Sequence, residues 1–236
     1  MILVLQFRTD QSGWHEVKCI YDSVGKNYND FLFMNVMSPF VTTEMILDKL
    51  KVAQAVILGG LGEGGYEDIE PHKIQNLRDM IDKLSPVIHL ISDSSIPTLG
   101  ICFGHQVLAD ILGGEVVTDP NMAESGVAEI ILTSDGKKDP VLQSLPGSFH
   151  GIVSHKSSVI QLPEGADVLA YSDRCPIQGF RYKSNIYGFQ LHPELDISDY
   201  RSRMKLYPEY MKHKVEFSDQ QEISARKILT NFMDLL

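Results

Sequence analysis

The sequence has few cysteines and no long hydrophobic run, and these two features limit the classes of protein to which it can belong. Its three cysteines, Cys19, Cys102 and Cys175, are far apart and odd in number. They offer neither a disulfide framework nor the CxxC spacing of a zinc site. The first apolar run, ILVLQF, is too short to cross a membrane and lacks the basic flank of a signal peptide. We therefore expect a cytoplasmic protein with no membrane partner and no bound metal.

Basic residues are also scarce. The chain has 21 Lys and Arg against 31 Asp and Glu, a net charge of −10, which argues against a broad surface for nucleic acid. No P-loop motif is present, and we expect no cofactor. The 236 residues, 43% of them hydrophobic and 22% charged, suit one globular domain with a sizeable core.

Short apolar runs mark the expected strands of the first half. They are ILVLQF (2–7), FLFMNV (31–36), AVILGG (55–60) and IPTLGIC (96–102). Residues 71–92 keep apolar residues at helical spacing, and residues 103–114 read as a helix that Gly113 ends. Strands joined by crossover helices predict an α/β fold with a mostly parallel open sheet and helices on both faces.

The second half contains closely spaced short strands, which predict a small antiparallel extension of the sheet. Their sequences are VAEIILT, SFHGIVSH, DVLAYS, IQGFRY and IYGFQLH. From residue 196 the chain turns polar and helix-like, with a plausible apolar stripe in ARKILTNFMDLL. We expect one domain at 1–195, with 196–236 as its C-terminal helical segment that completes the core.

A cysteine lies between two glycines in the pattern G-x-C-x-G at 100–104. The pattern falls at an expected strand-to-helix junction, as in a nucleophile elbow with cysteine in place of serine. Gly100 and Gly104 leave room for a strained turn, and the following helix N-terminus favours a thiolate at Cys102. The alternative is a buried cysteine at the end of a strand.

A cysteine nucleophile needs a base, and His192 is the best-placed histidine for that role. It follows an apolar strand in YGFQLHPEL and precedes Glu194 by two residues. A histidine at a strand end can take the thiol proton while a nearby carboxylate fixes its tautomer. The alternative is a surface histidine beside an unrelated glutamate.

The motifs GICFGHQ and GFQLHPE together resemble those of the triad (class I) glutamine amidotransferases. The resemblance covers about residues 50–195 and is nearest to the amidotransferase domain of GMP synthase, to which residues 139–173 are similar. It implies a flavodoxin-like architecture and hydrolysis of the glutamine γ-carboxamide through a γ-glutamyl thioester. It further implies Cys102 as nucleophile, His192 as general base and acid, and Glu194 as the orienting carboxylate.

The glycine-rich stretch LGGLGEGGYED (58–68) can point backbone N–H groups at developing negative charge. The resemblance implies the N–H groups of Gly60 and Phe103 as the oxyanion donors. A flexible loop or a nucleotide cradle is the alternative.

The resemblance also implies a set of contacts to the substrate glutamine, partly through the main chain of VSHKSS. We assign them to Gln106, Gly62, Ser154, His155, Lys156 and Ser157. The alternative for Gln106 is that it is simply a residue on the surface of the helix. His155 is a weak candidate for the base because no carboxylate stands at a suitable sequence spacing.

Some positions depart from the GMP synthase pattern. Leu61 replaces a proline, Ser125 an aromatic residue, and Lys156 and Ser157 a glycine and an aspartate. No synthetase half is visible either. The chain is thus a glutaminase with a separate synthetase partner, or a stand-alone γ-glutamyl peptidase acting on small γ-glutamyl amides. A third possibility is a non-catalytic member, whose Cys102 would be no more reactive than its other cysteines.

Overall fold

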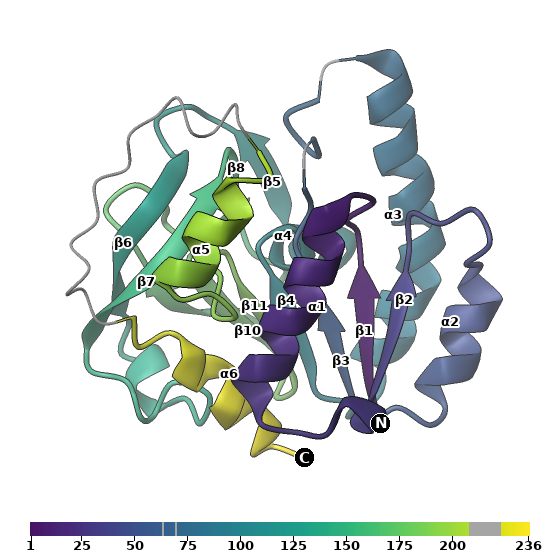
Figure 1. The fold of residues 1–236 in the computed structure, drawn as a ribbon. Coiled ribbons are helices and arrows are strands. Elements are labelled where there is room, and N and C mark those ends of the chain that lie inside the picture. The colour runs from purple at the N-terminus through teal and green to yellow at the C-terminus, as the bar shows by residue number, and fades with distance from the viewer. Residues whose placement is uncertain (63, 69, 208–222) are drawn as a thin grey trace.

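A computed structural model describes residues 1–62, 64–68, 70–207 and 223–236 (Figure 1). A nine-stranded sheet runs through it in the order β2-β1-β3-β4-β11-β10-β9-β6-β7. Its parallel part comprises β1 (Ile2–Gln6), β2 (Phe31–Asn35), β3 (Ala55–Leu58), β4 (Thr98–Ile101) and β11 (Ile186–Phe189). The helices that join the first four strands or follow them are α1 (Gln11–Val24), α2 (Thr43–Leu50), α3 (Pro71–Ser92) and α4 (Phe103–Ile111).

Antiparallel strands continue this sheet beyond β11. They are β10 (Gly179–Tyr182), β9 (Ala166–Tyr171), β6 (Glu124–Leu132) and β7 (Ser148–His155). A separate two-stranded sheet pairs β5 (Glu115–Thr118) with β8 (Ser157–Gln161), and two 3-10 turns are η1 (Tyr28–Asp30) and η2 (Gly136–Lys138). The expected α/β fold is confirmed, and its antiparallel extension is wider than the sequence suggested.

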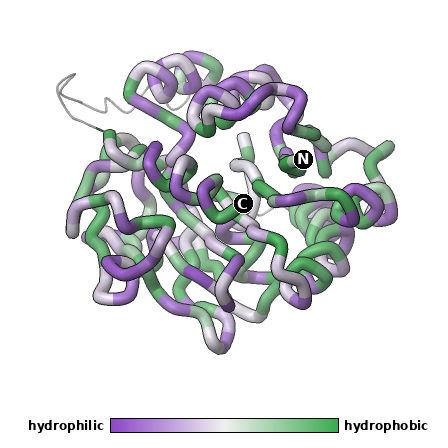
Figure 2. The backbone as a smooth tube through the Cα atoms, turned by 90° about the horizontal axis from the view of Figure 1, so that it is seen from below, coloured by the Kyte–Doolittle hydropathy of each residue, from purple (hydrophilic) through white to green (hydrophobic). Residues whose placement is uncertain are grey.

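Side chains of the parallel strands alternate between the two faces of the sheet. On one face, Ile2 and Val4 pack with residues of α1 and of the C-terminal helix α6 (Arg226–Met233). On the other face, Leu3 and Leu5 pack with α2, α3 and α4. Figure 2 shows hydrophobic and hydrophilic residues alternating along the outer segments, as amphipathic helices require. The strands are thus covered on both sides.

The segment after residue 195 joins this same core. α5 (Ile197–Met204) begins at a capping box formed by Asp196 and Asp199. In α6, Ile228, Leu229 and Phe232 are fully buried. The terminal helix therefore docks on the core, and the part of the expected segment at 208–222 lies outside the described residues.

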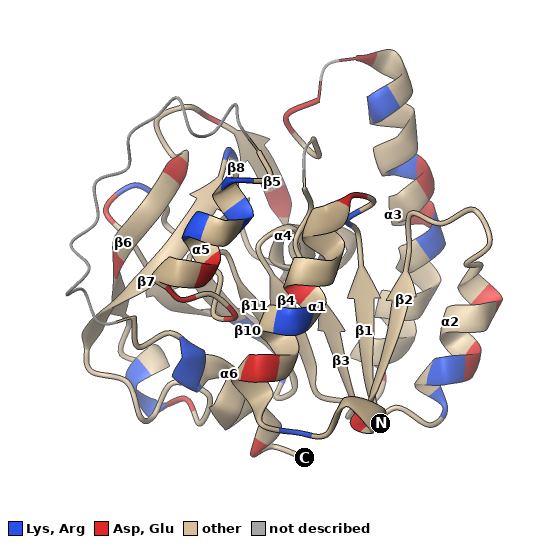
Figure 3. Ribbon diagram, in the orientation of Figure 1, with Lys and Arg blue, Asp and Glu red and all other residues tan. Residues whose placement is uncertain are grey.

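Charged residues lie mainly on the helices and connections, while the parallel strands are almost entirely tan, the colour of residues other than Lys, Arg, Asp and Glu, in Figure 3. Both α3 and α5 carry acidic as well as basic side chains, so neither helix is of one sign. Among the described residues, no helix is both long and apolar enough to cross a membrane.

Candidate active site

The two proposed reacting residues follow neighbouring parallel strands. Ile101 pairs with Phe189, and the Cys102 N–H donates to the Phe189 carbonyl at 2.8 Å. Because the carboxyl ends of parallel strands meet at one edge of a sheet, Cys102 after β4 and His192 after β11 come together there. The His192 N–H donates to the carbonyl of Ile152 in β7 at 2.7 Å, which fixes the chain beyond β11.

Cys102 occupies a sharp turn between β4 and α4. Its φ of 51° and ψ of −100° lie in a region that residues with a Cβ rarely adopt. The turn is tight enough that a Cβ on Gly100 would lie 2.6 Å from the carbonyl carbon of Gly104. This geometry is that of the elbow expected from the glycine pattern, and α4 begins directly after the thiol.

The strained backbone gives a prediction about stability. Cys102→Gly should be about 1–2 kcal/mol more stable than Cys102→Ala, because glycine relieves a strain of about 1–3 kcal/mol and costs only about 0.5–1 kcal/mol in chain entropy. Both variants lack the sulfur, so urea unfolding of the pair isolates the backbone. An alanine variant as stable as the glycine variant would show that the turn stores no strain.

His192 and Glu194 form a buried pair beside the thiol. The Nδ1 atom of His192 lies 2.9 Å from Glu194 Oε1, and the two side chains are 3% and 0% exposed. Burial alone would lower the pKa of His192, but the interactions of the imidazole with the Glu194 carboxylate and with Cys102 outweigh it and raise this pKa to about 9. Burial works to raise the pKa of Glu194, yet the cationic neighbours His192 and Arg203 bring it well below its usual range.

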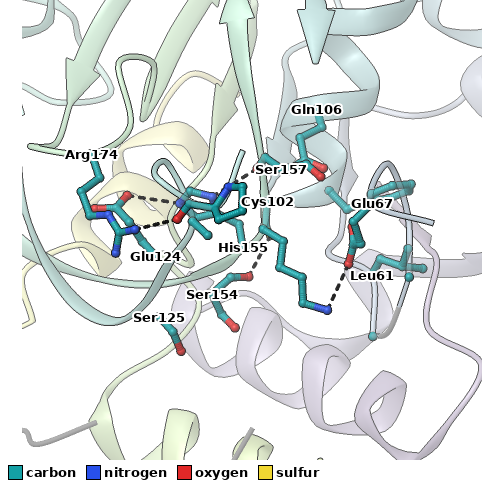
Figure 4. Close-up of a pocket in the computed structure, with 16 residues that line it drawn as sticks. Leu61, Glu67, Cys102, Gln106, Glu124, Ser125, Ser154, His155, Ser157 and Arg174 are labelled. Atoms are coloured by element: carbon teal, nitrogen blue, oxygen red, sulfur yellow. Dashed lines mark hydrogen bonds and ion pairs between the residues drawn. The ribbon is translucent and has the colours of Figure 1, made fainter. Parts of the chain in front are cut away.

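Cys102 lines a cavity of about 500 Å³. In Figure 4, Arg174 and Glu124 lie toward one side of it and Glu67 and Leu61 toward the other, with Cys102 between them. Every residue assigned to substrate contact lines this cavity, as does Phe103: Gly62, Gln106, Ser154, His155, Lys156 and Ser157. The cavity therefore gathers the predicted substrate contacts at the thiol.

Two glutamines border the sulfur. Gln106 in α4 is 5% exposed and donates to the Ser157 carbonyl at 2.8 Å and to Gln190 Oε1 at 3.1 Å. Gln190 in turn donates to the Cys102 sulfur at 3.6 Å. Gln190 stands in the motif GFQLHPE, from which no role was expected for it. The Ser154 carbonyl, 3.7 Å from the sulfur, accepts from the thiol on another side.

His155 has a carboxylate partner that sequence spacing did not reveal. Its Nε2 lies 3.2 Å from Glu124 Oε2, and its Nδ1 faces the Ser157 carbonyl at 3.1 Å. A carboxylate from β6 thus lies beside His155 although none stands near it in sequence, and this pair already holds the imidazole.

Two groups of side chains bring potential metal ligands within 4.8 Å of one another. One is Glu124, His155 and Cys175, and the other is His15, Cys19 and Asp199. In the first group the Glu124 carboxylate already accepts hydrogen bonds from Ser172 and Gln178 besides facing His155. This group is complete as a hydrogen-bonded network without an ion.

The predicted oxyanion donor Gly60 is already engaged. Its N–H donates to Glu16 Oε1 at 2.8 Å, and Arg8 Nε donates to the same oxygen at 3.1 Å. A Cβ on Gly60 would lie 2.9 Å from Arg8 Nη2 and 3.4 Å from His192 Cε1, so this buried pair adjoins the catalytic histidine candidate. Gly60 can serve an oxyanion only after Glu16 releases it, whereas Phe103 opens α4, where N–H groups have no intrahelical partner.

The glycines of this loop also satisfy the spacing GxGxxG at Gly60, Gly62 and Gly65. In dinucleotide sites a helix follows that motif directly and presents its N-terminus to the phosphates. Here α3 begins only at Pro71. The loop therefore lacks the directly following helix N-terminus that a nucleotide site would need to bind phosphates.

Comparison with known sequences agrees with this geometry. A family model described as glutamine amidotransferase class-I matches residues 21–206. The glutamine-hydrolyzing GMP synthase subunit from Methanocaldococcus jannaschii is 35% identical over 121 residues, 51% of this chain and 62% of that protein. The subunit of the same name from Sulfurisphaera tokodaii is 32% identical over 177 residues, 72% of this chain and 86% of its own length.

A third relative has another name. Gamma-glutamyl peptidase 5 from Arabidopsis thaliana is 36% identical over 118 residues, which are 49% of this chain and 47% of that protein. Among solved structures, a glutamine amidotransferase from Thermotoga maritima superimposes with a TM-score of 0.73 at 21% identity and covers 100% of this chain and 97% of its own. This last likeness concerns the fold. With the family model matching most of its length, the chain belongs to the class-I glutamine amidotransferase family.

Proposed function

We propose that this protein hydrolyses the γ-carboxamide of glutamine to glutamate and ammonia. The observation that carries the proposal is the buried relay at the sheet edge, in which Glu194 lies 2.9 Å from His192, His192 interacts electrostatically with Cys102, and Cys102 lines the cavity. A nucleophile, a base and an orienting carboxylate in this order are the requirements for acyl transfer.

In the proposed reaction the Cys102 thiolate attacks the amide carbon, and the carbonyl oxygen becomes an oxyanion. The N–H of Phe103 stabilises this oxygen, joined by Gly60 once Glu16 releases its N–H. The His192 imidazolium gives its proton to the departing nitrogen, so that the C–N bond breaks and ammonia leaves a γ-glutamyl thioester. His192, now neutral, takes a proton from water, whose oxygen attacks the thioester and releases glutamate and the thiolate.

We further propose that a separate synthetase protein uses the ammonia. Two relatives are named as subunits of a glutamine-hydrolyzing GMP synthase. The cavity that adjoins the thiol is where ammonia would form and from which it would leave. The partner would therefore bind over the cavity opening.

A second candidate is a γ-glutamyl peptidase, and the cavity size favours it. Its 500 Å³ correspond to roughly 17 water molecules, which exceeds what the ten heavy atoms of glutamine need. The cavity continues from Cys102 to the exposed Arg174, which leaves room for a residue linked to the γ-carbonyl. One relative also has this name.

The test compares glutamine with γ-glutamyl dipeptides on the purified full chain. Glutamate release from glutamine supports the first proposal, and addition of a synthetase partner should raise that rate if the two assemble. A strong preference for the dipeptides in the isolated chain would replace glutamine hydrolysis with peptidase activity. Absence of turnover on either substrate would refute both.

The His192 pKa of about 9 predicts how activity depends on pH. Acyl transfer needs the imidazolium to protonate the leaving ammonia, so kcat/KM should fall as the pH rises through about 9. Glu194→Gln removes the charge that raises this pKa while burial still lowers it, so the alkaline fall should move to lower pH. The amine of the substrate titrates in the same way with wild type and with Glu194→Gln. A difference between their two pH profiles therefore comes from the enzyme. Identical alkaline limbs would contradict the proposed role of Glu194.

A further inference from the structure

Arg203 contacts the same carboxylate oxygen as the proposed catalytic histidine. It lies in the last turn of α5, is 2% exposed, and its Nη1 donates to Glu194 Oε1 at 2.7 Å. His192 Nδ1 lies 2.9 Å from that oxygen. The second contact of the guanidinium is a hydrogen bond from Nε to His15 Nδ1 at 3.2 Å. A residue outside the sequence motifs thus reaches the centre of the site.

The pairing is not the arrangement that would stabilise a buried ion pair best. Arginine and carboxylate pair most strongly through two parallel hydrogen bonds. Here both cationic contacts converge on Oε1, while Glu194 Oε2 and Arg203 Nη2 have no hydrogen-bond partner among the described residues. Arg203 therefore competes with His192 for one oxygen instead of occupying the free one.

We propose that Arg203 is a positioning residue of the triad, which holds Glu194 and limits how strongly that carboxylate retains the His192 proton. Two cations share one anionic oxygen, so the positive charge of Arg203 opposes protonation of the imidazole. Without Arg203, Glu194 Oε1 would interact with His192 alone. The histidine would then release its proton to the leaving group less readily.

The other groups around this pair are fixed by the elements that pack on it. From α1 come His15, which accepts from Arg203 and has a pKa lowered by burial and by Arg203, and Cys19 beside it. The charged and titratable groups around Glu194, His192 and their immediate partners are Arg8, His15, Glu16, Cys19, Cys102, Asp199, Tyr200, Arg203 and Tyr207. Of these, only Arg203 is a cation with a hydrogen bond to Glu194 among the described residues, apart from His192 itself.

The test is an NMR titration of the His192 imidazole in the free protein, with His192→Gln to assign its signal. Arg203→Met should raise the His192 pKa by about one unit, and Arg203→Lys, which keeps the charge, should leave it near the wild-type value. Arg201→Met removes an equal charge from an exposed position of the same helix and should change nothing. Should the methionine variant not fold, Arg203→Gln removes the charge but retains a donor.

A purely structural Arg203 would predict a different outcome. Its loss would free Glu194 and lower the His192 pKa, as in Glu194→Gln, or leave it unchanged, and either result overturns the proposal. The titration needs no substrate, so its result does not depend on the proposed function. Only the role of Arg203 in catalysis rests on that function. If the full chain turns over glutamine, Arg203→Met should also move the alkaline limb upward, opposite to Glu194→Gln.

Discussion

Cys102→Ala should reduce glutamine hydrolysis by about 10⁴-fold or more, since loss of a nucleophile that acts in one unit with its base removes nearly the whole catalytic advantage. Alanine fits the same turn and leaves His192 and Glu194 in place, so the loss would come from the missing sulfur. Glutamate release measured over long incubations, with no added ammonia, determines the residual rate. A rate within tenfold of wild type would exclude Cys102 as the nucleophile.

The other two cysteines supply matched controls. Burial raises the pKa of Cys19 to about 12 and that of Cys175 to about 11, so both remain protonated thiols near neutral pH. Cys19→Ala and Cys175→Ala should therefore keep most of the activity. Iodoacetamide should likewise label Cys102 first, and equal labelling of all three thiols would favour a non-catalytic member of the family.

Gly100→Ala should destabilise the protein by about 3 kcal/mol or more and remove its activity. The added Cβ would lie 2.6 Å from Gly104 carbonyl atoms and 2.7 Å from the His105 backbone nitrogen. These are main-chain atoms of the turn and of α4, so no side-chain rotation relieves the clash. The turn that presents Cys102 would have to open. Urea unfolding and glutamate release measure the two effects.

Gly147→Ala is the matched control for this change. Gly147 is exposed, and the nearest atoms to an added Cβ belong to the flexible end of Lys137, at 3.3 Å. We expect a change within about 0.5 kcal/mol and full activity. If Gly100→Ala changed the free energy of unfolding as little as this control, the close contact between Gly100 and Gly104 would not be needed for stability.

The expected strands and the helix at 71–92 were predictable because their burial follows simple apolar patterns. α1 was not identified, because its buried face includes Ser12, Gly13 and Glu16 besides apolar residues. A polar buried face hides helical periodicity from a hydrophobicity pattern. β5 and β8 were missed because each is short and only partly apolar.

The site shows the same division between local and distant information. Cys102, His192 and Glu194 were predicted because each belongs to a short motif at a strand end. Arg203 and its partner His15 are 188 residues apart in the chain, and no local pattern joins them. Likewise, Gly60 looked free in sequence, because the carboxylate that accepts its N–H comes from a helix 44 residues earlier.

One face of the sheet is built from segments far apart in sequence, since β1 and α1 pack with α6. During translation the nascent polypeptide would leave part of the apolar side of β1 exposed until residues 226–233 have emerged from the ribosome, because α1 covers only the rest of that side. Chaperone binding to unfinished chains would then concentrate on that side, and cooperative folding would wait for α6.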